Sequence, residues 1–181
     1  MSAKIITFGI SKGGCSKSTS SGITAFLLSK SERVLAIDMD GQVNLTSLLT
    51  GEYDICNVFE EKTVLEAIIN QDARPYIINI RDNLDLLPSN DYLATLSRRM
   101  FEKRLKLDAL EKALEPIMDH YDWIIIDTPP ALSEQTILPL STKSKGGSYA
   151  VIMFDGSRFA YYAIQKFIEI IEATRQHNNP N

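Results

Sequence analysis

The segment from Ser11 to Thr19 carries the residue types that bind phosphate. It reads Ser-Lys-Gly-Gly-Cys-Ser-Lys-Ser-Thr and lies between a strand-like run and a helix-like run. Paired glycines let the backbone fold around a phosphate, and the amino end of the following helix adds partial positive charge. Lys17 is placed to reach the outer phosphates, and the Ser18 hydroxyl to bind Mg²⁺. The residues predicted to contact the phosphates are Lys12, Gly13, Gly14, Cys15, Ser16, Lys17, Ser18 and Thr19.

Two serines separate this loop from the standard phosphate-loop pattern, G-x-x-x-x-G-K-[ST]. Ser11 and Ser16 stand where the outer glycines belong, and serine adopts positive φ only at a steric cost. Taken alone, the segment is therefore also compatible with a plain Gly/Ser turn. A second lysine, Lys12, ahead of the two glycines is the unusual feature of the loop.

Asp127 is a candidate metal ligand because it ends a buried strand-like run. It follows Trp-Ile-Ile-Ile and precedes Thr-Pro-Pro. A carboxylate at a strand tip beside a phosphate loop can hold Mg²⁺ directly or through water. The alternative is an aspartate that caps the next turn, because Asp before Thr-Pro-Pro is also good turn chemistry. Pro129 and Pro130 stiffen the segment that would sense a terminal phosphate.

Asp38 and Asp40 form a second acidic pair at a strand end. They lie in Ala-Ile-Asp-Met-Asp-Gly-Gln-Val-Asn, and residues two apart in a strand face the same side. Asp38 suits an outer-shell contact to a metal, whereas Asp40 suits the orientation of an attacking water. A solvated acidic turn that caps the sheet is the alternative interpretation.

Alternating strand and helix signals determine how these residues are positioned. Continuous apolar strands between helices predict a doubly wound α/β fold, a mostly parallel sheet flanked by helices. Ligands of such sheets gather at the carboxyl ends of the strands, where the three polar clusters lie. Within the first helix, Ile23, Phe26 and Leu27 share one face. Strands are predicted at Ile5–Phe8, Val34–Ile37, Ile77–Ile80, Leu84–Leu87, Trp123–Ile126 and Tyr149–Phe154, and helices at Lys17–Ser29, Thr63–Ile69, Asp91–Met100, Leu105–Met118, Ser133–Leu140 and Phe159–Arg175.

Length and composition narrow the class of protein. The 181 residues suit one domain, residues 1–181, with a real core. The net charge of −4 gives no global attraction to nucleic acid or anionic membrane, so any DNA contact needs a local patch. Cys15 and Cys56 form no metal-type cluster. With neither a signal-peptide pattern nor a membrane-length apolar run, the expected location is the cytoplasm and no membrane partner is expected.

Four segments together resemble the ParA/MinD family of ATPases. The family's deviant Walker A loop, K-G-G-x-G-K-[ST], matches Lys12–Ser18, with Ser16 as the departure. Its I-D-x-D-P-Q-x-N-x-T segment matches Ile37–Thr46, with Gly41 in place of proline. Its Y-D-x-I-I-I-D-T-P-P segment matches Tyr121–Pro130, and N-L-D-L-I-P-S resembles the stretch around Leu84–Asn90. The similarity runs from residue 4 to about residue 175 and fits the plasmid or chromosome partition branch best.

The resemblance implies an ATP-dependent switch of the P-loop NTPase class, with ATP and Mg²⁺ as cofactors. In this family two subunits sandwich two ATP molecules, and the lysine matching Lys12 reaches the partner subunit's phosphates. Lys12, Lys17 and Asp40 are then the catalytic residues, while Ser18, Asp38 and Asp127 organise the metal. Family members in this form bind DNA non-specifically at the nucleoid, and a centromere-binding, ParB-like partner stimulates slow hydrolysis.

Two departures from the family pattern bear on these expectations. Ser16 narrows the loop or slows hydrolysis. Family members usually continue past the strand at Tyr149–Phe154 with a further strand and helices that contact adenine and DNA. The C-terminal part of the family fold, with its contacts to adenine and DNA, is therefore expected to be missing from residues 1–181.

Several alternatives stay open from the sequence. Ser11 and Ser16 are compatible with a non-hydrolysing nucleotide-dependent adaptor. A MinD-like membrane-cycling ATPase needs a terminal amphipathic helix, which the polar tail 175–181 does not offer. An iron–sulfur reductase needs cluster cysteines, yet none follows Cys56. The densest basic cluster is either a solvated helix face or a contact for a phosphate backbone; its members are Arg98, Arg99, Lys103, Arg104 and Lys106.

Overall fold

The computed structural model describes residues 2–9, 16–153, 164–165 and 167–173. Over these residues a six-stranded sheet has the strand order β3-β4-β2-β5-β1-β6. The strands are β1 (Lys4–Gly9), β2 (Val34–Asp38), β3 (Ile78–Arg81), β4 (Leu84–Leu87), β5 (Trp123–Asp127) and β6 (Ser148–Ile152). The α-helices are α1 (Lys17–Leu28), α2 (Asn44–Thr50), α3 (Ile55–Val58), α4 (Val64–Asn70), α5 (Leu96–Glu102), α6 (Ala109–Leu114) and α7 (Glu134–Ser141). The 3₁₀ helices are η1 (Arg74–Tyr76), η2 (Asp91–Thr95) and η3 (Glu115–His120).

The sheet is parallel except at one edge, as the sequence predicted for a mostly parallel α/β fold. β1 pairs in parallel with β5 and β6, and β2 pairs in parallel with β4 and β5. Only β3 runs antiparallel, as a hairpin with β4 that turns at Asn83, a residue in the left-handed region with φ 61°. The register aligns Asp38 with Asp127 at the carboxyl ends of β2 and β5.

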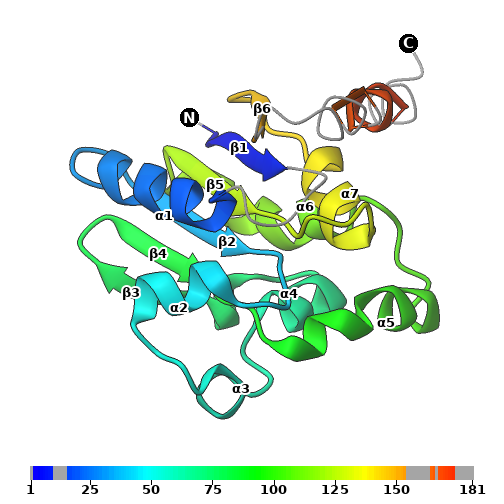
Figure 1. Ribbon diagram of the computed structural model, residues 1–181, viewed down its shortest axis with the longest axis horizontal. Helices are drawn as coiled ribbons and strands as arrows, with labels where there is room; N and C mark the ends of the chain where they lie inside the picture. Colours follow the sequence, from blue (N-terminus) through cyan, green and yellow to red (C-terminus); the bar gives the residue numbers. More distant parts are fainter. Residues whose placement is uncertain (1, 10–15, 154–163, 166, 174–181) are drawn as a thin grey trace.

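Helices cover the sheet on both faces, and each face has its own core (Figure 1). The larger core packs α4, α5, α6 and α7 against the strands and contains Ile5, Leu35 and Ile124. The smaller core lies under α1 and α2 and contains Phe8, Ala36 and Ile125. The alternation of these side chains along each strand places a buried apolar layer on both sides of the sheet. No helix among the described residues is long and apolar enough to cross a bilayer.

Most predicted elements are confirmed to within one or two residues. The first helix begins at Lys17 as predicted, and the helix after Thr63 begins with a capping box, in which Thr63 and Glu66 are bonded reciprocally. The last predicted strand lies at Ser148–Ile152, and its predicted end at Phe154 falls outside the described residues. Residues 164–165 and 167–173 are helical, within the helix predicted to end the chain.

Two long helix predictions were wrong in detail. The predicted helix at Leu105–Met118 is instead α6 followed by η3, because Pro116 lacks the N–H that an α-helix interior needs. Its predicted start is also non-helical, since Arg104 takes φ 54° just ahead of it. The predicted helix at Asp91–Met100 is divided into η2 and α5. Helices α2 and α3 were not predicted.

Candidate phosphate and metal site

The amino end of α1 meets the carboxyl end of β5 at the candidate site. Ser16 is the N-cap of α1 and lies in the left-handed region, with φ 53° and ψ 27°. Its side chain makes no capping hydrogen bond, and no acidic residue stands in the first turn. The first-turn N–H groups therefore have no side-chain cap from Ser16, and the turn itself contributes no acidic side chain that would compete with an anion. Residues 10–15 lie outside the described residues, so the predictions for Lys12, Gly13, Gly14 and Cys15 stay predictions.

Asp127 joins the first two side chains of α1. Lys17 Nζ lies 3.2 Å from Asp127 Oδ1, and Ser18 Oγ donates a hydrogen bond of 2.5 Å to Asp127 Oδ2. Lys17 is only 7% exposed and Asp127 is fully buried. Burial raises the pKa of Asp127, although the Lys17 ammonium and the Ser18 hydroxyl oppose that rise. A buried carboxylate, an ammonium and a hydroxyl are thus held within bonding distance of one another.

Asp38 has a different set of partners, all of them neutral. Its Oδ1 accepts from the backbone N–H of Asp40 at 3.0 Å. Its Oδ2 accepts from both the backbone N–H and the hydroxyl of Thr46, each at 2.8 Å. Asp38 is fully buried, and desolvation together with repulsion from Asp127 raises its pKa to about 7.

Asp40 occupies the turn that these bonds shape. It is 6% exposed, and its Oδ1 accepts from the backbone N–H of Gln42 at 3.0 Å. The Asp40 carboxylate contributes to the raised pKa of Asp127, so the two charges are near enough to interact. The N–H of Met39 bonds the carbonyl of Asp127 at 2.8 Å, which fixes the turn to the end of β5. The predicted convergence of Asp38, Asp40 and Asp127 is therefore observed.

Thr46 is a residue of this site for which no role was predicted from the sequence. It is fully buried, and besides its two bonds to Asp38 its hydroxyl accepts from the N–H of Ser89 at 3.0 Å. Thr46 thereby joins the end of β2, the start of α2 and the segment that follows β4. Its place at the end of the family-like segment Ile37–Thr46 was the available signal.

The turn between Asp40 and α2 is held in an unusual conformation. Val43, the N-cap of α2, takes φ 55° and ψ 24°. A β-branched side chain is strained in this left-handed region, where glycine is at ease. The two helices of the smaller core, α1 and α2, therefore each have an N-cap residue that takes left-handed backbone without being glycine.

Thr128 connects β5 to the phosphate-loop strand. Its hydroxyl and N–H both donate to the carbonyl of Phe8, at 2.8 and 3.3 Å. The Pro-Pro segment that follows ends at Ala131, whose carbonyl accepts from the Thr136 hydroxyl at 2.7 Å. These bonds fix the segment that leaves Asp127 to the end of β1 and to α7.

The geometry fits a magnesium ion held partly by a phosphate ligand. Among the described residues, no group of three or more His, Cys, Asp or Glu side chains is arranged to hold a metal by itself. Mg²⁺ commonly takes only one or two protein oxygens and completes its shell with water and phosphate. The adjacent oxygens of Ser18 and Asp127 match that donor set, whereas both oxygens of Asp38 already accept hydrogen bonds.

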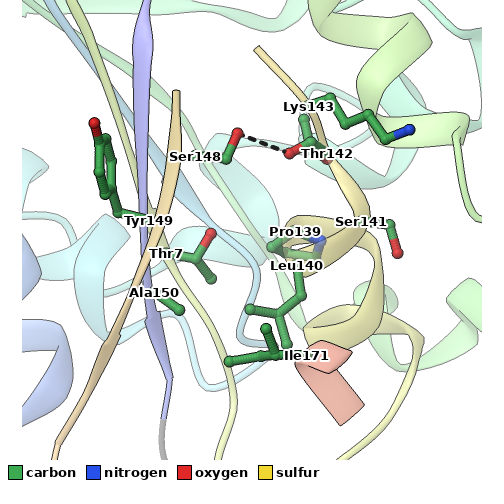
Figure 2. Close-up of a pocket in the computed structure, with 10 residues that line it drawn as sticks. All are labelled: Thr7, Pro139, Leu140, Ser141, Thr142, Lys143, Ser148, Tyr149, Ala150 and Ile171. Atoms are coloured by element: carbon green, nitrogen blue, oxygen red, sulfur yellow. Dashed lines mark hydrogen bonds between the residues drawn. The ribbon is translucent and has the colours of Figure 1, made fainter. Parts of the chain in front are cut away.

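A cavity that is separate from the candidate site lies beside β1. Its volume is about 140 Å³, and it lies between strands β1 and β6, α7 and the final helical segment (Figure 2). Its lining includes Ser148, the first residue of β6, so the cavity lies toward the amino end of that strand, away from Asp38 and Asp127. The lining residues are Thr7, Pro139, Leu140, Ser141, Thr142, Lys143, Ser148, Tyr149, Ala150 and Ile171.

The basic cluster lies on α5 and the turn that follows it. Arg98 forms an exposed pair with Glu102 at 3.7 Å, a contact of little energetic weight. Lys103, Arg104 and Lys106 are exposed as well. The arrangement matches a solvated helix face, and whether it contacts a phosphate backbone stays a prediction.

Comparison with known proteins places the chain in a family. A family model described as an AAA domain matches residues 3–181. The sporulation initiation inhibitor protein Soj of Bacillus subtilis is 30% identical over 179 residues, which cover 97% of this chain and 68% of Soj. The chain belongs to the ParA/MinD family of ATPases.

Solved structures of relatives agree with the fold of this ParA/MinD-family chain. A plasmid partition protein of Borrelia burgdorferi B31, bound to AMPPNP, has a TM-score of 0.81 and 32% identity over 96% of this chain and 70% of its own. Cobyrinic acid a,c-diamide synthase of Mycobacterium smegmatis, with ADP and magnesium, has a TM-score of 0.83 and 26% identity over 98% and 70%. The chain spans 62–68% of the length of relatives from Methanocaldococcus jannaschii, Pseudomonas putida and B. subtilis.

Proposed function

We propose that this chain forms an ATPase domain that binds and hydrolyses Mg-ATP, and that it acts as a dimerising switch. The observation that carries the proposal is the contact of Lys17 and Ser18 with Asp127, at the first turn of α1. An ammonium, a hydroxyl and the N–H groups of a helix amino end are the groups that a triphosphate needs. Relatives that hold AMPPNP or ADP with magnesium support adenine nucleotide as the ligand.

Each side chain of the site has a proposed role. Lys17 exchanges Asp127 for the β- and γ-phosphate oxygens, because a charged phosphate offers an ammonium stronger hydrogen bonds than a carboxylate it already shares. The backbone N–H groups of the loop from Lys12 to Thr19 surround the phosphates. Asp40 orients the attacking water. Asp38 supports that turn and lies where an outer-shell contact to the metal is possible.

Ser18 and Asp127 are the residues that would hold Mg²⁺. When bound, the ion neutralises charge that develops on the phosphate oxygens. The Ser18–Asp127 hydrogen bond holds the two oxygens together. That preorganisation favours binding, because less side-chain freedom remains to be lost.

Dimerisation follows from the second lysine of the loop. We propose that Lys12 acts in trans, on the nucleotide of a neighbouring subunit, in the manner of an arginine finger. ATP would then favour the dimer, because each triphosphate gains a cation from both subunits, and hydrolysis would remove that preference. The support is the match of Lys12–Ser18 to the family loop.

The cellular role that fits best is the positioning or segregation of DNA. Relatives named as a sporulation initiation inhibitor and a plasmid partition protein support this part of the proposal. The expected partners are a centromere-binding, ParB-like protein and non-specific DNA. A non-hydrolysing adaptor is the second candidate, since Ser16 holds the left-handed backbone that glycine would adopt without strain.

Binding and turnover separate these functions. Calorimetry with AMPPNP and Mg²⁺, together with phosphate release from ATP, would be measured for the wild type, Lys17→Ala and Lys12→Ala. We expect Lys17→Ala to lose binding and Lys12→Ala to bind but to lose turnover and nucleotide-dependent dimerisation. Lys62→Ala, which changes an exposed lysine outside the loop, is the matched control. Binding without any phosphate release, even with DNA and a cognate partner, would favour the adaptor.

A further inference from the structure

Helix α1 presents two faces of opposite character. The face against the sheet consists of small side chains, Ser21, Gly22 and Ala25, all buried. The apolar side chains that share the other face, Ile23 and Leu27, are each 53% exposed. Phe26 beside them is 42% exposed. The sequence correctly grouped these three residues on one face, but in the structure that face lies open.

A leucine of α2 extends this apolar surface. Leu48 is 52% exposed, and a Cβ added at Gly22 would lie 2.6 Å from its Cδ2, so the two helices touch at this point. Figure 1 shows α1 and α2 side by side on one face of the sheet. We call Ile23, Phe26, Leu27 and Leu48 the α1–α2 face.

Two cations lie at the rim of the α1–α2 face. The guanidinium of Arg81, from β3, lies 4.8 Å from the centre of the Phe26 ring, and Lys30 Nζ lies 5.8 Å from it. Both contacts are of the cation–π type. The ion pairs found among the described residues include neither Arg81 nor Lys30. Within the part of the chain that the structure describes, the charges of Arg81 and Lys30 therefore have no carboxylate partner.

The apolar α1–α2 face and the two cations at its rim together favour one kind of binding partner. Side chains at i, i+3 and i+4 on one helix, with a leucine from its neighbour, form the apolar strip on which an amphipathic helix docks. A second copy of this face would add two more cations to the rim and no opposite charge for Arg81 or Lys30, which opposes self-association. An acidic segment would instead meet opposite charge at both rim positions.

We propose that the α1–α2 face is a docking site for an amphipathic helical segment of a partner protein, with an apolar stripe flanked by Asp or Glu. The proposal does not rest on the proposed ATPase function. It is therefore tested without nucleotide.

The probes are two synthetic helical peptides with the same leucine stripe. One carries glutamates beside the stripe and the other carries lysines at the same positions. Binding of each labelled peptide to the wild-type chain is measured by fluorescence anisotropy, and circular dichroism melts check that every variant folds. We expect the acidic peptide to bind at least about tenfold tighter than the basic one, which is about 1.4 kcal/mol.

Two double variants locate the site. Ile23→Ser with Leu27→Ser should weaken the acidic peptide by about tenfold or more, because exposed apolar anchors dominate such contacts. Lys30→Glu with Arg81→Glu should reverse the preference, so that the basic peptide binds more tightly. Leu107→Ser is the matched control, because Leu107 is 41% exposed and lies outside α1 and α2. It should leave both affinities unchanged.

Three results would overturn the proposal. The first is equal affinity for the acidic and basic peptides. The second is binding of the acidic peptide that the Ile23→Ser, Leu27→Ser variant leaves unchanged. The third is nucleotide-free self-association of the wild type, seen by light scattering and lost in that variant, which would assign the face to a second copy of this chain.

Discussion

Asp127 and Asp38 are aligned at the ends of adjacent strands, yet their carboxylates are satisfied in different ways. Asp127 contacts a cation and a hydroxyl, Lys17 and Ser18, both at the start of one helix. Asp38 contacts only neutral donors, from Asp40 and Thr46. Both carboxylates are fully buried.

The difference separates a carboxylate that exchanges partners from one that shapes backbone. Under the proposed function, Lys17 and Ser18 would leave Asp127 for a phosphate and a metal, since a phosphate also forms charge-assisted hydrogen bonds with an ammonium. The donors of Asp38 belong to the turn and to the start of α2, so they cannot leave without unfolding this segment. We infer that Asp127 responds to the ligand and that Asp38 holds Asp40 in place. Four predictions test this distinction.

The largest effect on stability is expected from Lys17→Ala. Removing one member of a buried pair leaves the other charge uncompensated, at a cost of about 3 kcal/mol in the free energy of unfolding. Chemical denaturation of the nucleotide-free protein at pH 7 measures it. Lys62→Ala, at an exposed position, should stay within about 0.5 kcal/mol of the wild type. A Lys17→Ala protein as stable as the wild type would show that Asp127 is not paired with Lys17 in solution.

Thr46→Val is expected to cost about 2 kcal/mol, because a buried hydroxyl that both donates to Asp38 and accepts from Ser89 is lost. Valine keeps the shape of threonine, so packing changes little. Thr46→Ser retains the hydroxyl. It should therefore recover most of the stability and most of the phosphate-release rate that Thr46→Val loses. If valine behaves like the wild type while serine is impaired, Thr46 acts through its methyl group rather than through Asp38.

The pH dependence of stability distinguishes Asp38 from exposed carboxylates. Its pKa is about 7 in the folded protein, above the ordinary value of 3.8. Between these values the folded state binds the proton and the unfolded state does not, so stability falls as pH rises through this window. The slope is about 1.4 kcal/mol per pH unit. Denaturation from pH 4 to 7 without Mg²⁺ should show that Asp38→Asn removes this contribution.

Asp72→Asn provides the control for that pH series. Bonds from Arg74 lower the pKa of Asp72, so its contribution changes below pH 4 and not between pH 4 and 7. The variant should therefore keep the wild-type slope. An Asp38→Asn protein with an unaltered slope would mean that Asp38 is ionised throughout the window.

The smallest effect is expected at the N-cap of α1. Ser16→Gly should raise the free energy of unfolding by about 1 kcal/mol, because glycine takes φ 53° without the steric cost that serine bears. Ser20→Gly, inside the same helix, should lower it by about 0.5 kcal/mol, because glycine weakens a helix interior. Melting temperatures of the two variants should therefore move in opposite directions. A decrease for both would show that Ser16 is unstrained.

The sequence predicted the ends of the buried strands well. Runs of branched apolar residues end at Asp38 and Asp127, and both residues turned out to close their strands. The carboxyl ends of parallel strands lie at the same edge of a sheet. Asp38 and Asp127 could therefore be predicted to lie close together, although they are 89 positions apart in the sequence. The helix at Lys17–Ser29 was predicted from a different signal, the i, i+3, i+4 spacing of Ile23, Phe26 and Leu27.

Interactions that depend on tertiary contacts could not be predicted in the same way. Thr46 bonds Asp38 and Ser89 only because α2 turns back over β2 at Val43, and a valine gives no sign of left-handed backbone. The apolar pattern of Ile23, Phe26 and Leu27 is typical of a core-facing stripe. The sheet instead packs against the small residues of α1, and no local pattern distinguishes the two faces.

The central claim is that the first turn of α1 and Asp127 form a nucleotide triphosphate site. Titration calorimetry of AMPPNP into the wild-type chain, with and without Mg²⁺, tests it most directly. We predict saturable heat that depends on Mg²⁺ and that Lys17→Ala abolishes while Lys62→Ala retains. Absence of heat in the wild type, or heat that Lys17→Ala leaves unchanged, would contradict the claim.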